Sequence, residues 1–212
     1  MYGQNLKHWD AKPWKPGRTP DGIDHLGSNY RGRPILQTPV DLWLFSELLE
    51  RELPDVIVEV GVFAGGFSTW IHDQTETLPF EVRPIILGID REIPDGIYGF
   101  GEWPRLISMK CDSLDPAVCE VIRSMREKRT PGDLRPTIVI LDDDHNPDHV
   151  IDELDKFAAA LRAGDWLIVC DTTPLPETAD VVREWLETAI DFESVPLDRF
   201  GLSNHRGGWL RC

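Results

Sequence analysis

A run of β-branched residues that ends in a glycine loop constrains the fold more than any other stretch of this sequence. Residues 56–60 read V-I-V-E-V, and the loop G-V-F-A-G-G follows at residues 61–66. A short continuous apolar run is typical of a parallel strand covered on both faces, and closely spaced glycines let the backbone turn sharply. The stretch therefore predicts a buried strand, a ligand-binding loop and a helix that starts near Phe67 or Ser68.

The spacing around the glycines indicates the ligand class. A dinucleotide fingerprint has the order G-x-G-x-x-G with a ribose-binding acid about 20 residues later. Here the order is E-x-G-x-x-x-G-G, and the next acid at a strand end, Asp90, lies too far along the chain. Glu59, before the first glycine, repels a pyrophosphate but attracts a ligand with an ammonium group and a sulfonium. These features indicate S-adenosylmethionine, with Asp90 at its ribose; a plain strand-to-helix turn is the alternative.

Length and charge limit the class of protein and partner. The 212 residues suffice for one sizeable core, so we expect one domain over residues 1–212. The formal net charge is −15 without a basic stripe, which argues against a nucleic-acid partner. Neither a signal-peptide pattern nor a bilayer-length apolar stretch is present, so we expect a cytoplasmic protein without a membrane partner. The four cysteines contain no C-x-x-C pair, which indicates reduced thiols.

The N-terminal quarter is expected to be an arm and a covering helix. The segment up to about residue 33 is rich in Pro, Gly, Trp and charge, which predicts an arm without regular elements. Its tryptophans need burial on the core or on a second subunit, and we expect a homo-oligomer. The arm either packs there or covers the ligand pocket. Residues 38–53 predict a helix with Thr38 as N-cap and Pro39 at its first position.

Strands and helices alternate after the glycine loop. Alternation predicts an α/β fold, a doubly wound and mostly parallel sheet covered on both faces. The expected strands are 83–90, 106–110, 136–142, 166–171, 192–197 and 208–211, and the expected helices are 68–74, 116–129, 150–161 and 178–190. Ligands of such sheets bind at the carboxyl ends of the strands. Five acids stand at or next to these ends and are expected in one crevice: Glu59, Asp90, Asp112, Asp142 and Asp171.

These motifs resemble the class I methyltransferases, which use S-adenosylmethionine. Within them the chain is similar to the cephalosporin hydroxylase family and its kin, the metal-dependent O-methyltransferases of macrolide and rhamnosyl sugars. The resemblance is carried by E-V-G-V-F-A-G-G-F-S, G-I-D-R, C-D-S, L-D-D-D-H and C-D-T, and it extends to residues 30–43 and to the terminal N-H-R-G-G-W-L. It implies a Rossmann-like sheet with an antiparallel last strand.

The resemblance also implies roles for individual residues. It places Asp142 and Asp171 as ligands of Mg²⁺ or another divalent cation, and His145 as the catalytic base. The implied cofactor contacts are Glu59, Gly61, Gly65, Gly66, Ser68, Asp90, Arg91, Asp112 and Ser113. Helix capping is the alternative role for His145.

Cys170 departs from the family pattern, because relatives have an acidic pair where this chain has Cys170-Asp171. Magnesium prefers hard oxygen ligands, and a thiol is a poor substitute. Either the site is weak, Asp143 or Asp144 replaces the lost acid, a softer ion is used, or no metal binds. We interpret Cys170 itself as a buried structural thiol.

The resulting hypothesis is an S-adenosylmethionine-dependent O-methyltransferase that acts on a hydroxyl of a sugar or secondary-metabolite small molecule. A base in line with the hydroxyl, helped by a cation that lowers its pKa, is what the reaction needs. The alternatives are a catalytically impaired or metal-independent member of the same family, and a nicotinamide-dependent sugar dehydrogenase or epimerase. The arm and the loop at residues 93–105, with Tyr98, Phe100 and Trp103, are expected to select the acceptor.

Overall fold

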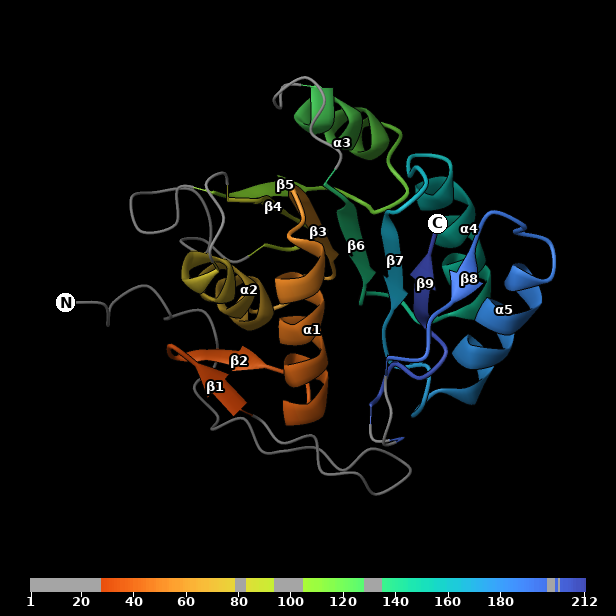
Figure 1. Ribbon diagram of the computed structural model, residues 1–212, viewed down its shortest axis with the longest axis horizontal. Helices are drawn as coiled ribbons and strands as arrows, with labels where there is room; N and C mark the ends of the chain where they lie inside the picture. The colour runs from red at the N-terminus through yellow and green to blue at the C-terminus, as the bar shows by residue number, and fades with distance from the viewer. Residues whose placement is uncertain (1–27, 79–82, 94–104, 128–134, 198–200, 202) are drawn as a thin grey trace.

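The computed structural model describes residues 28–78, 83–93, 105–127, 135–197, 201 and 203–212. Most of the predicted arm and most of the predicted acceptor loop, including Tyr98, Phe100 and Trp103, lie outside these residues. The described elements alternate along the chain as predicted and form one central sheet, with a small hairpin beside it (Figure 1).

Within the described residues, the central sheet has seven strands in the order β5-β4-β3-β6-β7-β9-β8. The parallel strands are β3 (Val56–Val60), β4 (Ile85–Asp90), β5 (Leu106–Lys110), β6 (Thr137–Leu141) and β7 (Trp166–Val169). The last strand, β9 (Trp209–Arg211), is antiparallel to both β7 and β8 (Glu193–Ser194). The Rossmann-like doubly wound sheet with an antiparallel last strand is therefore confirmed. The strand order reverses between β3 and β6, so their carboxyl ends mark the expected ligand crevice.

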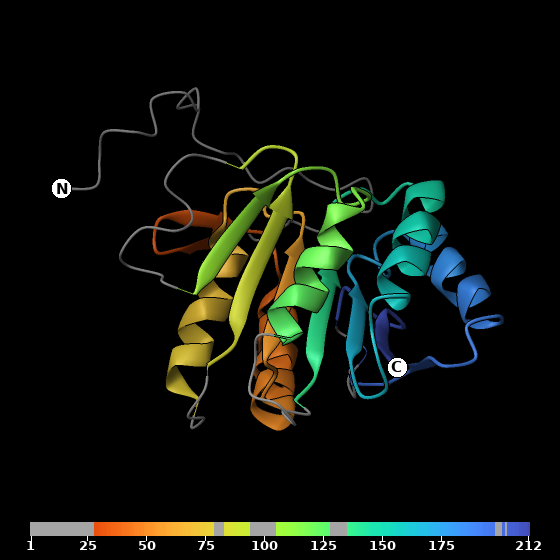
Figure 2. The ribbon, with the colours of Figure 1, turned by 90° about the horizontal axis from the view of Figure 1, so that it is seen from above.

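Helices cover both faces of the sheet, as Figures 1 and 2 show. One face carries α1 (Pro39–Glu52) and α2 (Gly66–Thr77), and the other carries α3 (Ala117–Glu127), α4 (Pro147–Ala158) and α5 (Pro176–Leu186). Side chains of β3 alternate between the two cores: Ile57 packs on the first face, and Val58 and Val60 pack on the second. Burial on both sides explains why the strand is a continuous apolar run interrupted by a single acid.

A β-hairpin precedes α1, so the prediction that the segment up to about residue 33 makes no regular element is wrong at its end. β1 (Ser28–Tyr30) pairs with β2 (Arg33–Ile35) in antiparallel fashion. Arg31 and Gly32 connect them with φ angles of 49° and 80°, the conformation of a two-residue hairpin turn. The Arg-Gly pair between these short strands was the signal available in the sequence.

Two helix starts follow from their caps. The side chain of Thr38 accepts the N–H of Asp41 at 3.2 Å, so α1 begins at Pro39 as predicted. Helix α4 begins at Pro147 rather than at Val150, because Asn146 is its cap and accepts the N–H of Asp148 at 3.1 Å. No helix in the part of the chain that the structure describes is long and apolar enough to cross a bilayer.

Candidate active site

A cavity of about 570 Å³ opens at the carboxyl ends of β3, β4, β6 and β7. Four of the five predicted acids line it together: Glu59, Asp90, Asp142 and Asp171. The residues just before α1, including Gln37, form another part of its wall. A cavity of this size suits a small molecule, and the shared crevice predicted for the acids is confirmed for these four.

The fifth acid, Asp112, is not among the residues that line this cavity. Its exposed carboxylate pairs with Arg91 at 2.8 Å between Nη2 and Oδ2. The N–H of Leu114, and then the Arg91 guanidinium, lower the pKa of Asp112. Arg91, which follows β4, lines the cavity, and so do Cys111 and Ser113, the residues on either side of Asp112 after β5.

The glycine loop is shaped mainly by contacts within the protein. Gly61 and Gly65 have φ angles of 87° and 73°, so both need the left-handed conformation that glycine adopts freely. A Cβ atom on Gly61 would overlap the carbonyl oxygen of Asp142, and one on Gly66 would overlap that of Pro34. Gly61 and Gly66 line the cavity, whereas Gly65 is not among its lining residues. The loop therefore needs glycine to fit against β6 and the hairpin as well as to admit a ligand.

Glu59 is a buried carboxyl group at the end of β3, only 1% exposed. The hydroxyl of Ser68, at the start of α2, donates to it, so Ser68 supports the cavity wall from behind. Burial raises the pKa of Glu59 to about 8, although the Ser68 hydroxyl opposes the shift. A cationic ligand group in the cavity would stabilise the ionised form of this carboxyl.

Asp90 is held in place by main-chain donors. Its Oδ2 accepts the N–H of Phe63 and its Oδ1 accepts the N–H of Glu92, each at 2.9 Å. Phe63 has a φ angle of 50°, the unusual conformation that turns its N–H toward Asp90. The end of β4 and the glycine loop are thereby locked together, and the carboxylate of Asp90 is oriented at the cavity.

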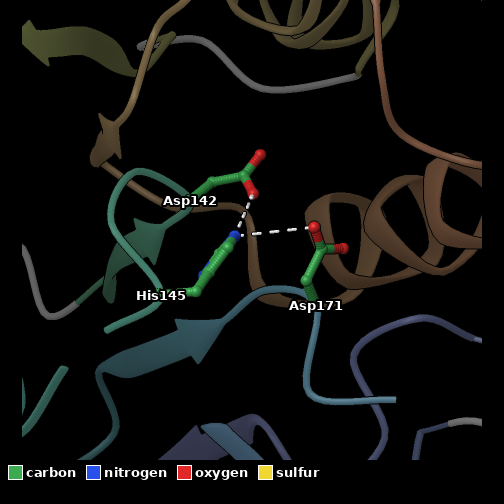
Figure 3. Close-up of side chains that lie close together, drawn as sticks. All are labelled: Asp142, His145 and Asp171. Atoms are coloured by element: carbon green, nitrogen blue, oxygen red, sulfur yellow. Dashed lines mark ion pairs between the residues drawn. The ribbon is translucent and has the colours of Figure 1, made fainter. Parts of the chain in front are cut away.

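Asp142, His145 and Asp171 converge on the other side of the cavity (Figure 3). His145 Nε2 lies 4.0 Å from Asp142 Oδ1 and 3.5 Å from Asp171 Oδ2. One donor atom from each of the three residues lies within 4.8 Å of the others, a spacing that can hold a metal ion. Asn146, not His145, caps α4, so the capping alternative for His145 is wrong.

The two carboxylates are close enough to perturb each other and the histidine. Burial, followed by the charge of Asp171, raises the pKa of Asp142 well above its ordinary value. Burial alone would lower the pKa of His145, but the hydrogen bond to Asp171 and the charges of both carboxylates outweigh it and raise that pKa. The group is therefore a concentration of negative charge that a cation would relieve.

Cys170 turns away from this group, as the interpretation of a structural thiol predicted. Its side chain is fully buried in the apolar core beside α1 and α2, and burial raises the pKa of the thiol well above its usual range. The strand predicted over residues 166–171 ends at Val169 in the structure, and Asp171 adopts a φ angle of 54°. Cys170 lies in the same core as Ile168, as the alternation of the strand requires, and the chain then turns at Asp171, which lines the cavity.

Neither of the acids proposed as a substitute joins the group around Asp142. Asp144 accepts the N–H of Asn146 at 3.0 Å within the turn before α4. Asp143 lies 3.6 Å from His149 Nε2, which is also 3.4 Å from Glu153 Oε1 and 3.3 Å from Ser113 Oγ. This second cluster supports Ser113 from behind the cavity, and burial raises the pKa of Glu153 to about 8.

Two buried residues that contact the site were missed in the sequence. Gln37 Nε2 donates to Asp142 Oδ2 at 2.7 Å. His205 lies 2.8 Å from Gln37 Oε1 through Nε2, and its Nδ1 accepts the N–H of Asp171 at 2.9 Å. Both residues fall inside the terminal stretches that carry the family resemblance, which was the only signal for them.

Comparisons with known proteins show which family this chain belongs to. A family model described as Rhamnosyl O-methyltransferase/CmcI matches residues 25–211. Curated rhamnosyl O-methyltransferases of Mycobacterium bovis and Mycobacterium leprae are each 27% identical over 147 residues, which is 68% of this chain. The matched part spans 57% and 60% of those two relatives, less than two thirds of their length.

Solved structures of CmcI share the fold. The apo structure has a TM-score of 0.70 at 23% identity, and the complex with Mg and SAM has a TM-score of 0.65 at 21% identity. Each match covers 100% of this chain and 85% of the solved chain. At these identities the similarity to solved structures establishes the fold, and the match of the family model establishes the family. The chain belongs to the rhamnosyl O-methyltransferase/CmcI family.

Proposed function

We propose that this chain is an S-adenosylmethionine-dependent O-methyltransferase that acts on a hydroxyl of a sugar or a related secondary metabolite. The observation that carries the proposal is one cavity with two chemically distinct sides: Glu59 and Asp90 on one, and Asp142, His145 and Asp171 on the other. The rhamnosyl O-methyltransferases among the relatives support O-methylation of a sugar, and the complex of CmcI with Mg and SAM supports the cofactor.

The first side suits S-adenosylmethionine. Each oxygen of Asp90 accepts one backbone N–H and keeps a free lone pair for a ribose hydroxyl. Glu59 offers a buried carboxylate to the ammonium or sulfonium charge of the cofactor, and that charge would offset the cost of ionising it. We assign the adenine to the loops after β4 and β5, where Arg91 and Ser113 line the same cavity.

The second side suits deprotonation of an acceptor hydroxyl. His145 Nε2 takes the proton as the hydroxyl oxygen forms its bond to the methyl carbon. The bond between methyl carbon and sulfur breaks with its electron pair on sulfur, and S-adenosylhomocysteine leaves. The protein holds the oxygen, the carbon and the sulfur in line, which removes much of the entropic barrier.

The residues present fit a divalent cation without Cys170. The carboxylates of Asp142 and Asp171 converge beside His145, and the raised pKa of Asp142 reflects charge that lacks compensation. When bound, a cation would lower the pKa of the acceptor hydroxyl. Because Asp142 and Asp171 supply only two carboxylates and Cys170 does not provide a third hard donor, we expect Mg²⁺ to bind weakly.

The second candidate is a family member that binds S-adenosylmethionine but uses no cation. The observation that favours it is the burial of Cys170, which leaves no donor at the position where the family resemblance implies an acid. In that case His145 acts alone in a cavity that excludes water. The homo-oligomer and the role of the N-terminal arm stay predictions, and light scattering on the full chain tests the former.

A chelator experiment separates the two candidates. Methyl transfer from labelled S-adenosylmethionine to a panel of rhamnosides and other sugar acceptors is followed before and after EDTA, and again after Mn²⁺ or Mg²⁺ is returned. Cation-assisted O-methylation requires loss and recovery of turnover. Turnover that is indifferent to the chelator selects the cation-independent enzyme. Stabilisation by NAD⁺ but not by S-adenosylhomocysteine in thermal unfolding would instead point to the dehydrogenase alternative.

A further inference from the structure

We propose that Gln37 and His205 are positioning residues that fix which oxygen of Asp142 faces His145 and the proposed cation. They form a buried relay that starts at the main chain of Asp171 and ends on the carboxylate of Asp142. Gln37 is 5% exposed and His205 is 1% exposed, so bulk water does not compete for these hydrogen bonds. The inference rests on the proposed function, because the two residues would prepare the cation side of the cavity, formed by Asp142, His145 and Asp171, for the proposed cation.

The direction of every hydrogen bond in the relay is determined. The N–H of Asp171 can only donate, so His205 Nδ1 must be the acceptor and carry no proton. The neutral ring therefore carries its proton on Nε2, which donates to Gln37 Oε1 at 2.8 Å. This contact fixes the orientation of the amide, and Gln37 Nε2 then donates to Asp142 Oδ2 at 2.7 Å.

The relay gives the two carboxylate oxygens of Asp142 different contacts. Oδ2 is occupied by Gln37, whereas Oδ1 is the atom 4.0 Å from His145 Nε2. Asp142 is thereby presented through one defined oxygen, by a donor that adds no net charge to the site. Partners that orient a metal-binding side chain in this way typically contribute a factor of about 10 to 100 in metal affinity.

Asp41, a buried acid in the first turn of α1, holds the loop that carries His205. Its Oδ1 accepts the Ser203 hydroxyl at 2.7 Å and the N–H of Asn204 at 3.0 Å. The loop before β9 is therefore fixed against the start of α1, next to Gln37. The ring of His205 also packs against Phe45 and Trp209, with centroids 6.0 Å from each.

The test measures cation affinity by calorimetry with MnCl₂, in protein saturated with S-adenosylhomocysteine. Gln37→Leu keeps the approximate volume but cannot donate, so we expect cation affinity to fall by about 10-fold to 100-fold. His205→Gln retains a donor near the position of Nε2 and should stay closer to wild type than His205→Asn, which retains an acceptor near Nδ1 only. Equal losses in both His205 variants, or unchanged affinity in Gln37→Leu, would overturn the proposal.

A double variant tests whether His205 acts through Gln37. If it does, adding His205→Asn to Gln37→Leu weakens cation affinity no further, whereas two independent structural effects would add. His72→Gln is the matched control, because His72 is also a buried histidine, lies on α2 and should leave cation affinity unchanged. Thermal unfolding of each variant identifies any that fail to fold. If Gln37→Leu fails to fold, Gln37→Met replaces it.

The outcome for the relay can be separated from the outcome for the proposed function. A wild type that binds no Mn²⁺ or Mg²⁺ would refute the cation site but would leave the relay testable. ¹⁵N spectra of the histidine rings then decide, because the relay requires the proton of His205 on Nε2. A proton on Nδ1 of His205 would overturn the relay, since that nitrogen must accept the N–H of Asp171.

Discussion

The two sides of the cavity are built in different ways. On the proposed cofactor side, formed by Glu59 and Asp90, the hydrogen bond from the Phe63 N–H to Asp90 joins residues that lie 27 positions apart within one β-α-β unit. On the cation side, Gln37 contacts Asp142 across 105 positions and His205 across 168. The cofactor side is thus a local product of one strand, one loop and the next strand, whereas the cation side requires both ends of the described chain to be in place.

The difference has a physical consequence. Local contacts form at a small cost in chain entropy, and main-chain donors such as the N–H of Phe63 do not depend on a distant side chain. The cation side brings half-buried charges close together, and distant polar groups must orient them. Substitutions there should change catalysis while cofactor binding persists, and substitutions on the cofactor side should do the reverse.

The largest effect is expected at His145. His145→Ala removes the base and should lower turnover by about 100-fold to 10,000-fold, because proton transfer to a positioned group contributes that much. Affinity for S-adenosylhomocysteine, measured by calorimetry, should stay near wild type. The same titration with Mn²⁺ distinguishes the roles of the imidazole: a large loss of cation affinity would make His145 a ligand rather than the base.

The next effect is on the cofactor side, at Asp90. Asp90→Ala removes a charged acceptor for the ribose hydroxyls and should cost about 2 kcal/mol of binding, or about 30-fold in affinity for S-adenosylhomocysteine. Asp112→Ala is the matched control, because that exposed ion pair contributes at most about 1 kcal/mol. Calorimetry that ranks the two variants in the opposite order would contradict the assignment of Asp90 to the ribose.

A smaller effect is expected from the ionisation of Glu59. Its pKa of about 8 means that the free protein holds it mostly protonated at pH 7. If the ionised form binds the cofactor's positive charge, affinity should rise about fivefold between pH 7 and pH 8, with release of a proton. Calorimetry in two buffers of different ionisation enthalpy measures both quantities. In Glu59→Gln the pH dependence should disappear; if it persists, another group is responsible.

The raised pKa of Glu59 also determines whether the ligand-free protein becomes more or less stable as pH rises. Because the folded-state pKa of Glu59 lies above the ordinary value of 4.5, the folded state binds more protons than the unfolded state between about pH 4.5 and pH 8. The contribution of Glu59 to the free energy of unfolding therefore falls as pH rises through this window. Denaturant unfolding of Glu59→Gln should show a higher stability than wild type at pH 8 and a weaker pH dependence.

The smallest effect is expected at Cys170. Its side chain lies in the core beside α1 and α2, so Cys170→Ser should leave Mn²⁺ affinity within about twofold. The cost should show as about 1 kcal/mol of stability, because a hydroxyl replaces a thiol in an apolar environment. A strong loss of cation affinity would mean that the sulfur of Cys170 contacts the cation.

The sequence predicted most of the architecture, since the strong patterns are local. The run 56–60 and the glycine loop identified β3 and the start of α2, and Thr38-Pro39 identified the start of α1. The β1–β2 hairpin was missed because its strands are only three residues each and lie next to an irregular composition. The end of β7 was misplaced because the left-handed conformation of Asp171 is fixed by a bond from its N–H to His205, far along the chain.

Composition, periodicity and spacing alone thus determined that this chain is a doubly wound α/β protein with acids at its strand ends. A strand buried on two faces requires a run of apolar residues, and a sharp turn requires glycine, so both features can be recognised from residues that are adjacent in the sequence. Only the tertiary structure decided which acids share a cavity, that Cys170 points into the core while Asp171 points out of it, and that Gln37 and His205 meet behind Asp142. These outcomes depend on backbone angles at single residues and on hydrogen bonds between distant segments. Neither leaves a periodic trace in a sequence.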